Sequence, residues 1–175
     1  FFHWLELNSE KLVLFEKNEM KQMIKRCAEL HMNQISNGGD PFEMGSARPL
    51  DFGHWSAHKL ESMTNYRLRH GEAVAIGIAL DSRYSVLAGM LDKGIEERIC
   101  CLLEYLGFNL WNSILEKINS NNELEIIKGL RDFQEHLGGQ LTITLLKEIG
   151  VGFEVNEMNI SLIKDAIEWL KERNK

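Results

Sequence analysis

The sequence feature that most constrains the fold is the segment from Gly71 to Leu87, which is apolar nearly all round in its first half. Its larger apolar residues are Val74, Ile76, Ile78, Ala79, Leu80 and Val86. A helix without a polar face must be covered on every side, so this segment predicts a central buried helix. Gly77 within it costs about 1 kcal/mol relative to alanine, which indicates that a neighbouring element packs closely there.

The rest of the chain is expected to surround this helix. Apolar residues at helical spacing predict six further helices, over residues 16–35, 54–63, 95–106, 111–118, 124–133 and 159–171. Alternation of threonine with aliphatic residues over 140–146 predicts a strand, and the run 151–155 can pair with it. Both prolines lie in the loop from Ser36 to Pro49. The expected fold class is mainly α, a helical domain with a minor β-ribbon.

Composition narrows the class of protein. The chain has 175 residues, enough for one domain with its own core, and we expect a single domain over residues 1–175. A formal charge of −6 and a pI near 5.6 argue against binding nucleic acid or an anionic membrane. No apolar run reaches the roughly 18–20 residues of a membrane span, and the start has no signal-peptide pattern.

The cysteines and the start of the chain give two further expectations. Cys27, Cys100 and Cys101 have no metal-ligand spacing, so we expect buried free thiols in a cytoplasmic protein. The chain begins Phe1-Phe2-His3-Trp4 without a methionine. Because three of these four residues are large aromatics, we expect that the chain begins inside a larger protein.

Three of the six histidines lie between residues 54 and 70. On a helix His54 and His58 are one turn apart and project from the same face, a spacing at which two imidazoles can share a metal or a substrate. His70 opens the next helix, and a tight helix-turn-helix would return it to that face. The same spacing also fits surface or core histidines that bind nothing.

The sequence around these histidines resembles the signature of 3-dehydroquinate synthase and its sugar-phosphate cyclase relatives. The similar segments are Leu50-Asp51-Phe52-Gly53-His54-x-x-x-His58-x-x-Glu61 and His70-Gly71-Glu72-Ala73-Val74-Ala75-x-Gly77. The similarity extends to residues 40–48, 103–107 and 138–146, so it covers most of the chain. The resemblance implies the helical metal- and substrate-binding C-terminal domain of that family.

The resemblance also implies a set of site residues and cofactors. His54 and His70 match the two histidine ligands of the family's zinc (or cobalt), and His58 matches a catalytic histidine that contacts the substrate. The third ligand, a glutamate, belongs to a segment upstream of this chain. NAD is bound in the family by a separate N-terminal domain, which residues 1–15 are expected to join. We therefore expect this chain alone to hold metal weakly and to be inactive.

Departures from 3-dehydroquinate synthase bear on the substrate. Asp51 stands where that enzyme has asparagine, and it is expected to bind a substrate hydroxyl and to take part in catalysis. Arg48 matches a substrate-binding arginine one position out of register. Two lysines that grip an anionic substrate are replaced, one around His31 and one around His136 or Leu137. With Glu135–Gly139, these changes favour a valiolone-type cyclase that uses sedoheptulose 7-phosphate, with 3-dehydroquinate synthesis as the other product class.

Partners and rival functions follow from the same resemblance. The expected partners are a sugar phosphate, the N-terminal NAD-binding domain and a second copy in a homodimer, with no nucleic acid and no membrane. Glu61 is expected to orient a side chain or cap the turn, and Glu72 to support a ligand histidine. A metal-dependent alcohol or glycerol dehydrogenase shares the HxxxH helix, but the Asp51-Phe52-Gly53 sequence favours the cyclase. A non-catalytic helical module is the alternative from another class.

Overall fold

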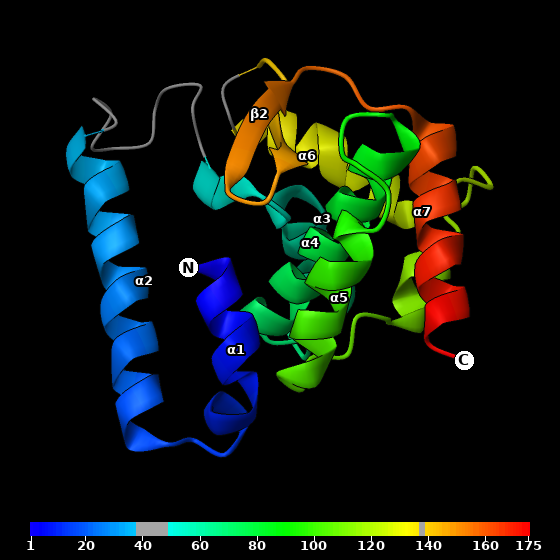
Figure 1. Cartoon of the computed structure of the whole chain (residues 1–175). Helices are drawn as coiled ribbons and strands as arrows, with labels where there is room; N and C mark the ends of the chain where they lie inside the picture. The colour runs from blue at the N-terminus through cyan, green and yellow to red at the C-terminus, as the bar shows by residue number, and fades with distance from the viewer. Residues whose placement is uncertain (38–48, 137–138) are drawn as a thin grey trace.

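The computed structural model describes residues 1–37, 49–136 and 139–175, and it shows a helical body with a small β-ribbon at one end (Figure 1). The α-helices of the described residues are α1 (Phe2–Val13), α2 (Lys17–Asn37), α3 (His54–Met63), α4 (His70–Leu87), α5 (Ile95–Tyr105), α6 (Lys128–His136) and α7 (Ile160–Arg173). Short 3₁₀ turns are η1 (Pro49–Asp51), η2 (Ser113–Glu116) and η3 (Glu125–Ile127). The mainly α class with a minor ribbon is confirmed.

Helix α4 occupies the centre of the domain, as its apolar sequence predicts. Helices α3, α5 and α7 pack against it together with the first ribbon strand, β1 (Ile143–Glu148). Its fully buried apolar side chains include Ala73, Ile76, Ala79 and Leu80. Trp55 and Leu60 of α3 and Ile163 and Leu170 of α7 complete the same core. The helix that begins at His70 therefore runs through the core of the described residues.

Two glycines allow α3 and α4 to approach each other closely. A Cβ atom on Gly77 would lie 1.9 Å from the carbonyl oxygen of Gly53, and one on Gly53 would lie 2.7 Å from the backbone nitrogen of Ile78. Gly53 also has a φ of +80°, in the left-handed region that favours glycine. The close packing expected at Gly77 is thus confirmed. Its partner is Gly53, the residue directly before α3.

The two strands form an antiparallel ribbon. Strand β1 pairs with β2 (Val151–Val155) from Ile143 opposite Val155 to Leu146 opposite Gly152, with an irregularity before Glu148. Ile143 and Leu145 belong to the same core as the helices, and Thr144 between them is also buried. The predicted strands are confirmed, although β1 begins three residues later than the threonine alternation indicates.

Helices α1 and α2 form an antiparallel arm beside the body (Figure 1). Helix α2 packs chiefly on α1, and α1 packs on α5, where Glu6 accepts hydrogen bonds from Arg98 at 2.5 and 2.6 Å. The predicted helix over 16–35 matches α2 closely. Helix α1 was not expected, because aromatic residues at the start obscure its helical spacing.

Three expectations need correction or completion. The helix predicted over 111–118 is only the 3₁₀ turn η2, started by Asn112, whose side chain accepts from the Ile114 backbone N–H at 3.0 Å. Of the cysteines, only Cys100 is buried, whereas Cys27 and Cys101 are exposed; all three are free thiols. Among the described helices, none has the length and apolar character to cross a membrane.

Candidate metal and substrate site

The site begins where α3 starts. The left-handed conformation of Gly53 turns the chain so that α3 begins at His54, and the Gly53 carbonyl accepts the first helical hydrogen bond from Ala57 N–H at 3.3 Å. His54 and His58 then lie one turn apart, with ring centroids 5.6 Å apart in an edge-to-face arrangement. The helix predicted from this spacing is present.

A tight turn brings the third histidine to the same place. The Thr64 hydroxyl ends α3 by donating to the Leu60 carbonyl at 2.8 Å, and Asn65 and Tyr66 adopt left-handed backbone conformations. Helix α4 then begins at His70, whose ring lies 5.4 Å from that of His54 and 6.2 Å from that of His58. The structure therefore brings together all three histidines that the sequence singles out.

Hydrogen bonds orient two of these rings. His54 Nδ1 lies 3.1 Å from the carbonyl oxygen of Phe52, and His70 Nδ1 lies 3.3 Å from Oε1 of Glu61. A carbonyl and a carboxylate accept hydrogen bonds, so these partners assign an Nδ1–H to each ring. Each Nε2 then keeps its lone pair, which is the form in which imidazole binds a metal.

Glu61 adds a carboxylate to the cluster. Ligand atoms of His58, Glu61 and His70 lie within 4.8 Å of one another, close enough to surround a single cation. The side chain of Glu61 is largely buried, at 16% exposure, whereas that of His70 is 57% exposed. The cluster thus has a buried acidic side and an open side.

The expectation that Glu72 supports a ligand histidine is wrong. Its carboxylate accepts from the backbone N–H of Arg69 at 2.9 Å and from the Arg69 guanidinium. Glu72 and Arg69 together cap the start of α4. The Arg69 partner lowers the pKa of Glu72. Glu61, one helix earlier, is the residue that holds the His70 ring.

The predicted substrate residues have different placements. Asp51 is half-buried in η1, directly before the turn that leads into α3. Arg48 lies outside the described residues, as do the segment 40–48 and Leu137. His31 is exposed on α2, and the side chain of His136 is not among those described. Asp51 and His58 are therefore the predicted substrate residues whose surroundings can be described.

A cleft of about 210 Å³ opens beside His58. It is lined by Trp55, His58, Lys59, Ser62, Gly129, Asp132 and Phe133. Lys59 is only 13% exposed and pairs with Asp132 at 2.8 Å and with Glu125 at 3.9 Å, so its charge is balanced within the protein. Sequence reasoning missed the contribution of α6 to this cleft, because no local pattern shows that α6 packs on α3.

A buried acid behind the site was also missed. Asp81 in α4 is fully buried, and its Oδ1 accepts from the Trp55 indole N–H at 2.8 Å while its Oδ2 accepts from Gly53 N–H at 3.2 Å. Burial raises the pKa of Asp81 to about 7, against the opposing effect of the two hydrogen bonds. An acid directly after the apolar run 73–80 is the sequence signal that could have identified it.

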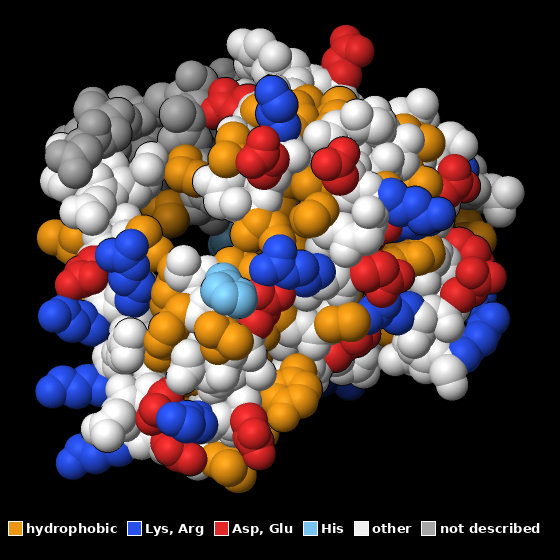
Figure 2. Space-filling view, in the orientation of Figure 1, with side chains coloured by type: hydrophobic (Ala, Val, Ile, Leu, Met, Phe, Trp, Pro, Cys, Tyr) orange, Lys and Arg blue, Asp and Glu red, His pale blue; other side chains and the backbone are white. Residues whose placement is uncertain are grey.

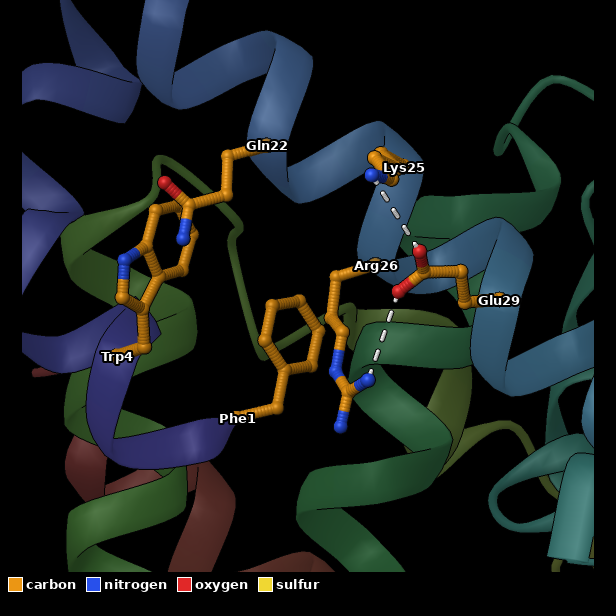
Figure 3. Close-up of a pocket in the computed structure, with 6 residues that line it drawn as sticks. All are labelled: Phe1, Trp4, Gln22, Lys25, Arg26 and Glu29. Atoms are coloured by element: carbon orange, nitrogen blue, oxygen red, sulfur yellow. Dashed lines mark ion pairs between the residues drawn. The ribbon is translucent and has the colours of Figure 1, made fainter.

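A second, larger cleft lies between α1 and α2 (Figure 3). It has a volume of about 460 Å³ and is lined by Phe1, Trp4, Gln22, Lys25, Arg26 and Glu29. Lys25 and Arg26 both pair with Glu29, at 3.7 and 3.5 Å. Figure 2 shows the surface hollowed between α2 and the body of the domain. The lining residues include no histidine, and both basic side chains pair with Glu29, so this cleft lacks the donor cluster found at the three histidines.

The fold and the cluster together define a class, a helical domain that carries a candidate metal and substrate site at a helix-turn-helix. Comparison with known proteins identifies the family. The model of the 3-dehydroquinate synthase C-terminal family matches residues 1–131, which contain α1 to α5, all three histidines and Glu61. The chain belongs to this family.

Individual relatives agree with this assignment. The 3-dehydroquinate synthase of Shewanella frigidimarina is 29% identical over 168 residues, which are 95% of this chain and 45% of that protein. The enzyme of the same name from Clostridium perfringens strain 13 is 32% identical over 153 residues, covering 84% of this chain and 41% of the relative. The chain therefore spans less than half the length of these relatives.

A solved structure shares the fold. ValA, a 2-epi-5-epi-valiolone synthase from Streptomyces hygroscopicus subsp. jinggangensis 5008 with NAD⁺ and Zn²⁺ bound, superposes with a TM-score of 0.79 at 22% identity. The match covers 98% of this chain and 47% of that one. It thus includes the ribbon and α7, which lie beyond the range of the family model.

Proposed function

We propose that this chain is the C-terminal metal- and substrate-binding domain of an NAD-dependent sugar-phosphate cyclase, which eliminates phosphate and closes a carbocycle. The observation that carries the proposal is the convergence of His54, His58 and His70 within the range matched by the family model. The cofactors would be zinc or cobalt here and NAD on an N-terminal domain, as the bound groups of ValA suggest for a protein of this fold.

Nitrogen and oxygen donors of the kind that bind zinc meet at this site, but the set whose ligand atoms lie within 4.8 Å of one another is His58, Glu61 and His70 and does not include His54. His54 and His70 each have Nδ1 engaged by an acceptor, which leaves two Nε2 atoms as ligands. Zinc sites that act in catalysis combine three nitrogen or oxygen ligands with an open position. Two imidazoles supply part of such a set, and the glutamate implied by the family would come from outside this chain. A bound metal would supply Lewis-acid polarisation of substrate oxygens.

Three residues of this chain would have separate roles in binding and proton transfer. His58, exposed at the mouth of the cleft beside Phe133, would hydrogen-bond a substrate hydroxyl or phosphate and move a proton between substrate oxygens. Asp51 would accept a hydrogen bond from a second hydroxyl and so orient the sugar. Glu61 would keep the His70 ring in place while the substrate binds.

The described residues favour a substrate with fewer anionic groups. Asp51 would repel a substrate carboxylate, and Lys59, which lines the cleft beside His58, is already paired with two acids. A ketose monophosphate without a carboxylate, such as sedoheptulose 7-phosphate, carries less negative charge than a seven-carbon keto-acid phosphate and suits these surroundings better. We therefore propose a valiolone-type product over 3-dehydroquinate.

The test combines this chain with an NAD-binding domain, either in one polypeptide or added separately, and measures release of inorganic phosphate from each sugar phosphate with NAD and zinc. Release from sedoheptulose 7-phosphate supports the proposal in full. Turnover of only the keto-acid phosphate contradicts the substrate assignment. A steady change in nicotinamide absorbance with a simple alcohol would instead indicate a dehydrogenase, because a cyclase returns the hydride within each cycle.

A further inference from the structure

Asp81 contacts the chain on both sides of His54. Its Oδ2 accepts from the backbone N–H of Gly53 at 3.2 Å, and its Oδ1 accepts from the indole N–H of Trp55 at 2.8 Å. The carboxylate has no exposed surface. Both oxygens of this buried acid therefore bind residues that flank His54. These two hydrogen bonds fix the backbone on either side of the candidate ligand.

The contact with Gly53 reaches the His54 ring through a single peptide group. The N–H of Gly53 and the carbonyl of Phe52 belong to the same peptide, which is planar and trans. Its N–H donates to Asp81, and its carbonyl accepts from Nδ1 of His54 at 3.1 Å. Because the two bonds of a trans peptide point in opposite directions, holding the N–H towards Asp81 directs the carbonyl away from it, towards the His54 ring.

The neighbouring glycine contact prevents this peptide from moving away. Gly77 lies one turn before Asp81, so both residues are on the same face of α4. The Gly53 carbonyl approaches Gly77 so closely that no Cβ would fit between them. The turn at Phe52 and Gly53 thus contacts one face of α4 twice, at Gly77 by close packing and at Asp81 by a hydrogen bond.

Packing alone does not require an acid at this position. Burying a carboxylate costs desolvation energy, and a buried ion-forming group is weak as a source of stability. What a carboxylate provides is two acceptors with a fixed separation, here matched to one backbone donor and one indole donor. Orientation of the turn is therefore the role that best accounts for Asp81.

We propose that Asp81 is a positioning residue for His54, and that it acts through the Phe52–Gly53 peptide to keep the proton on Nδ1 and the Nε2 lone pair available to a ligand. This inference rests on the proposed function in one respect, since His54 matters as a candidate metal ligand. The orientation of the ring can be tested without metal, substrate or activity.

The test uses the 175-residue chain with ¹⁵N-labelled histidine and records long-range ¹H–¹⁵N correlations of the imidazoles at pH 8. In the wild-type chain His54 should show the Nδ1–H tautomer. Asp81→Ala removes both acceptors and Asp81→Asn leaves only one, so both should shift His54 towards a mixture of tautomers. Trp55→Phe removes only the indole donor and should leave the Nδ1–H form dominant.

A matched control separates orientation from general destabilisation. Glu96 is another buried carboxylate, which accepts from the backbone N–H of Gly94 at 2.6 Å and from Arg83 at 2.8 Å in a different part of the core. Glu96→Gln should lower stability and leave the His54 tautomer unchanged. An unchanged His54 tautomer in folded Asp81→Asn, or an equal change in Glu96→Gln, would overturn the proposal.

A zinc titration of the same samples separates this inference from the proposed function. If zinc perturbs His54 in the wild-type chain, Asp81→Asn should weaken that binding by about tenfold, in the range typical of residues that orient a metal ligand. Equal zinc affinity in the two chains would count against the role of Asp81. If zinc perturbs no histidine in any chain, the metal site is refuted, and the tautomer comparison still decides the role of Asp81.

Discussion

Oε1 of Glu61 lies 3.3 Å from Nδ1 of His70, so an acid near the end of α3 fixes a ring at the start of α4. The two residues are nine positions apart in sequence and belong to different helices, and only the tight turn between them makes the contact. This pair joins the two halves of the histidine cluster.

Replacing Glu61 should weaken metal binding without unfolding the domain. Glu61→Gln keeps the size of the side chain but replaces the charged acceptor with a weaker one, and Glu61→Ala removes it. We expect zinc affinity to fall by about tenfold in Glu61→Gln and further in Glu61→Ala, in the range of 10- to 100-fold seen for such partners. Calorimetric titration measures this loss.

Glu72→Gln is the matched control for Glu61, because its carboxylate caps α4 with Arg69 and does not contact the histidines in the described contacts. It should lower the midpoint of urea denaturation slightly, as the loss of a helix cap does, and leave zinc affinity unchanged. An equal loss of affinity in both variants would show that Glu61 has no specific role.

Gly77→Ala should be severely destabilising. The added Cβ would lie 1.9 Å from the Gly53 carbonyl oxygen, so the start of α3 must move away from α4. Overpacking typically costs about 1–3 kcal/mol and occasionally more, and the midpoint of urea denaturation measures it. Gly71→Ala in the same helix meets nothing within 4 Å and should be neutral or slightly stabilising. Similar midpoints for the two variants would contradict the close contact.

The stability of the wild-type chain should depend on pH through the ionisation of Asp81. Burial raises the pKa of Asp81 from 3.8 to about 7 in the folded chain, so between these values the folded chain keeps a proton that the unfolded chain has released. The stabilising contribution of this proton to the free energy of unfolding is therefore complete below pH 4 and is lost as the pH rises through 7. The expected slope approaches −1.4 kcal/mol per pH unit for one proton, an order-of-magnitude figure.

Asp81→Asn cannot ionise, and its stability should change less than that of the wild-type chain between pH 4 and 7. Denaturation at several pH values measures both curves, and the difference between them isolates Asp81 from groups common to both proteins. Parallel curves would mean that the carboxyl is already ionised at pH 4 in the folded chain.

Much of the fold could be predicted from the sequence because long periodic segments determine it. The apolar run at Gly71–Leu87 identifies the central helix, and the spacing of His54 and His58 on a helix places both rings on one face. The ribbon follows from the threonine alternation. These features depend on residues near one another in the chain.

The remainder depends on contacts that no local pattern contains. Asp81 is understood only when its contacts with Gly53 and Trp55, 28 and 26 residues earlier, are known. Glu61 orients a side chain as expected, that of His70, whereas Glu72 pairs with Arg69 at the start of α4 although it lies only two residues from His70. The cleft beside His58 likewise needs Phe133 from a helix far along the chain.

The most direct test of the central claim is a zinc titration of the wild-type chain, followed through the imidazole signals of all six histidines. We expect one saturable and weak site that shifts His54, His70 and their neighbour His58 together. The exposed His3 and His31 should stay unchanged, and His70→Ala should abolish the effect. Zinc that leaves the cluster unperturbed at millimolar concentration, or that shifts His3 and His31 equally, would contradict the metal site.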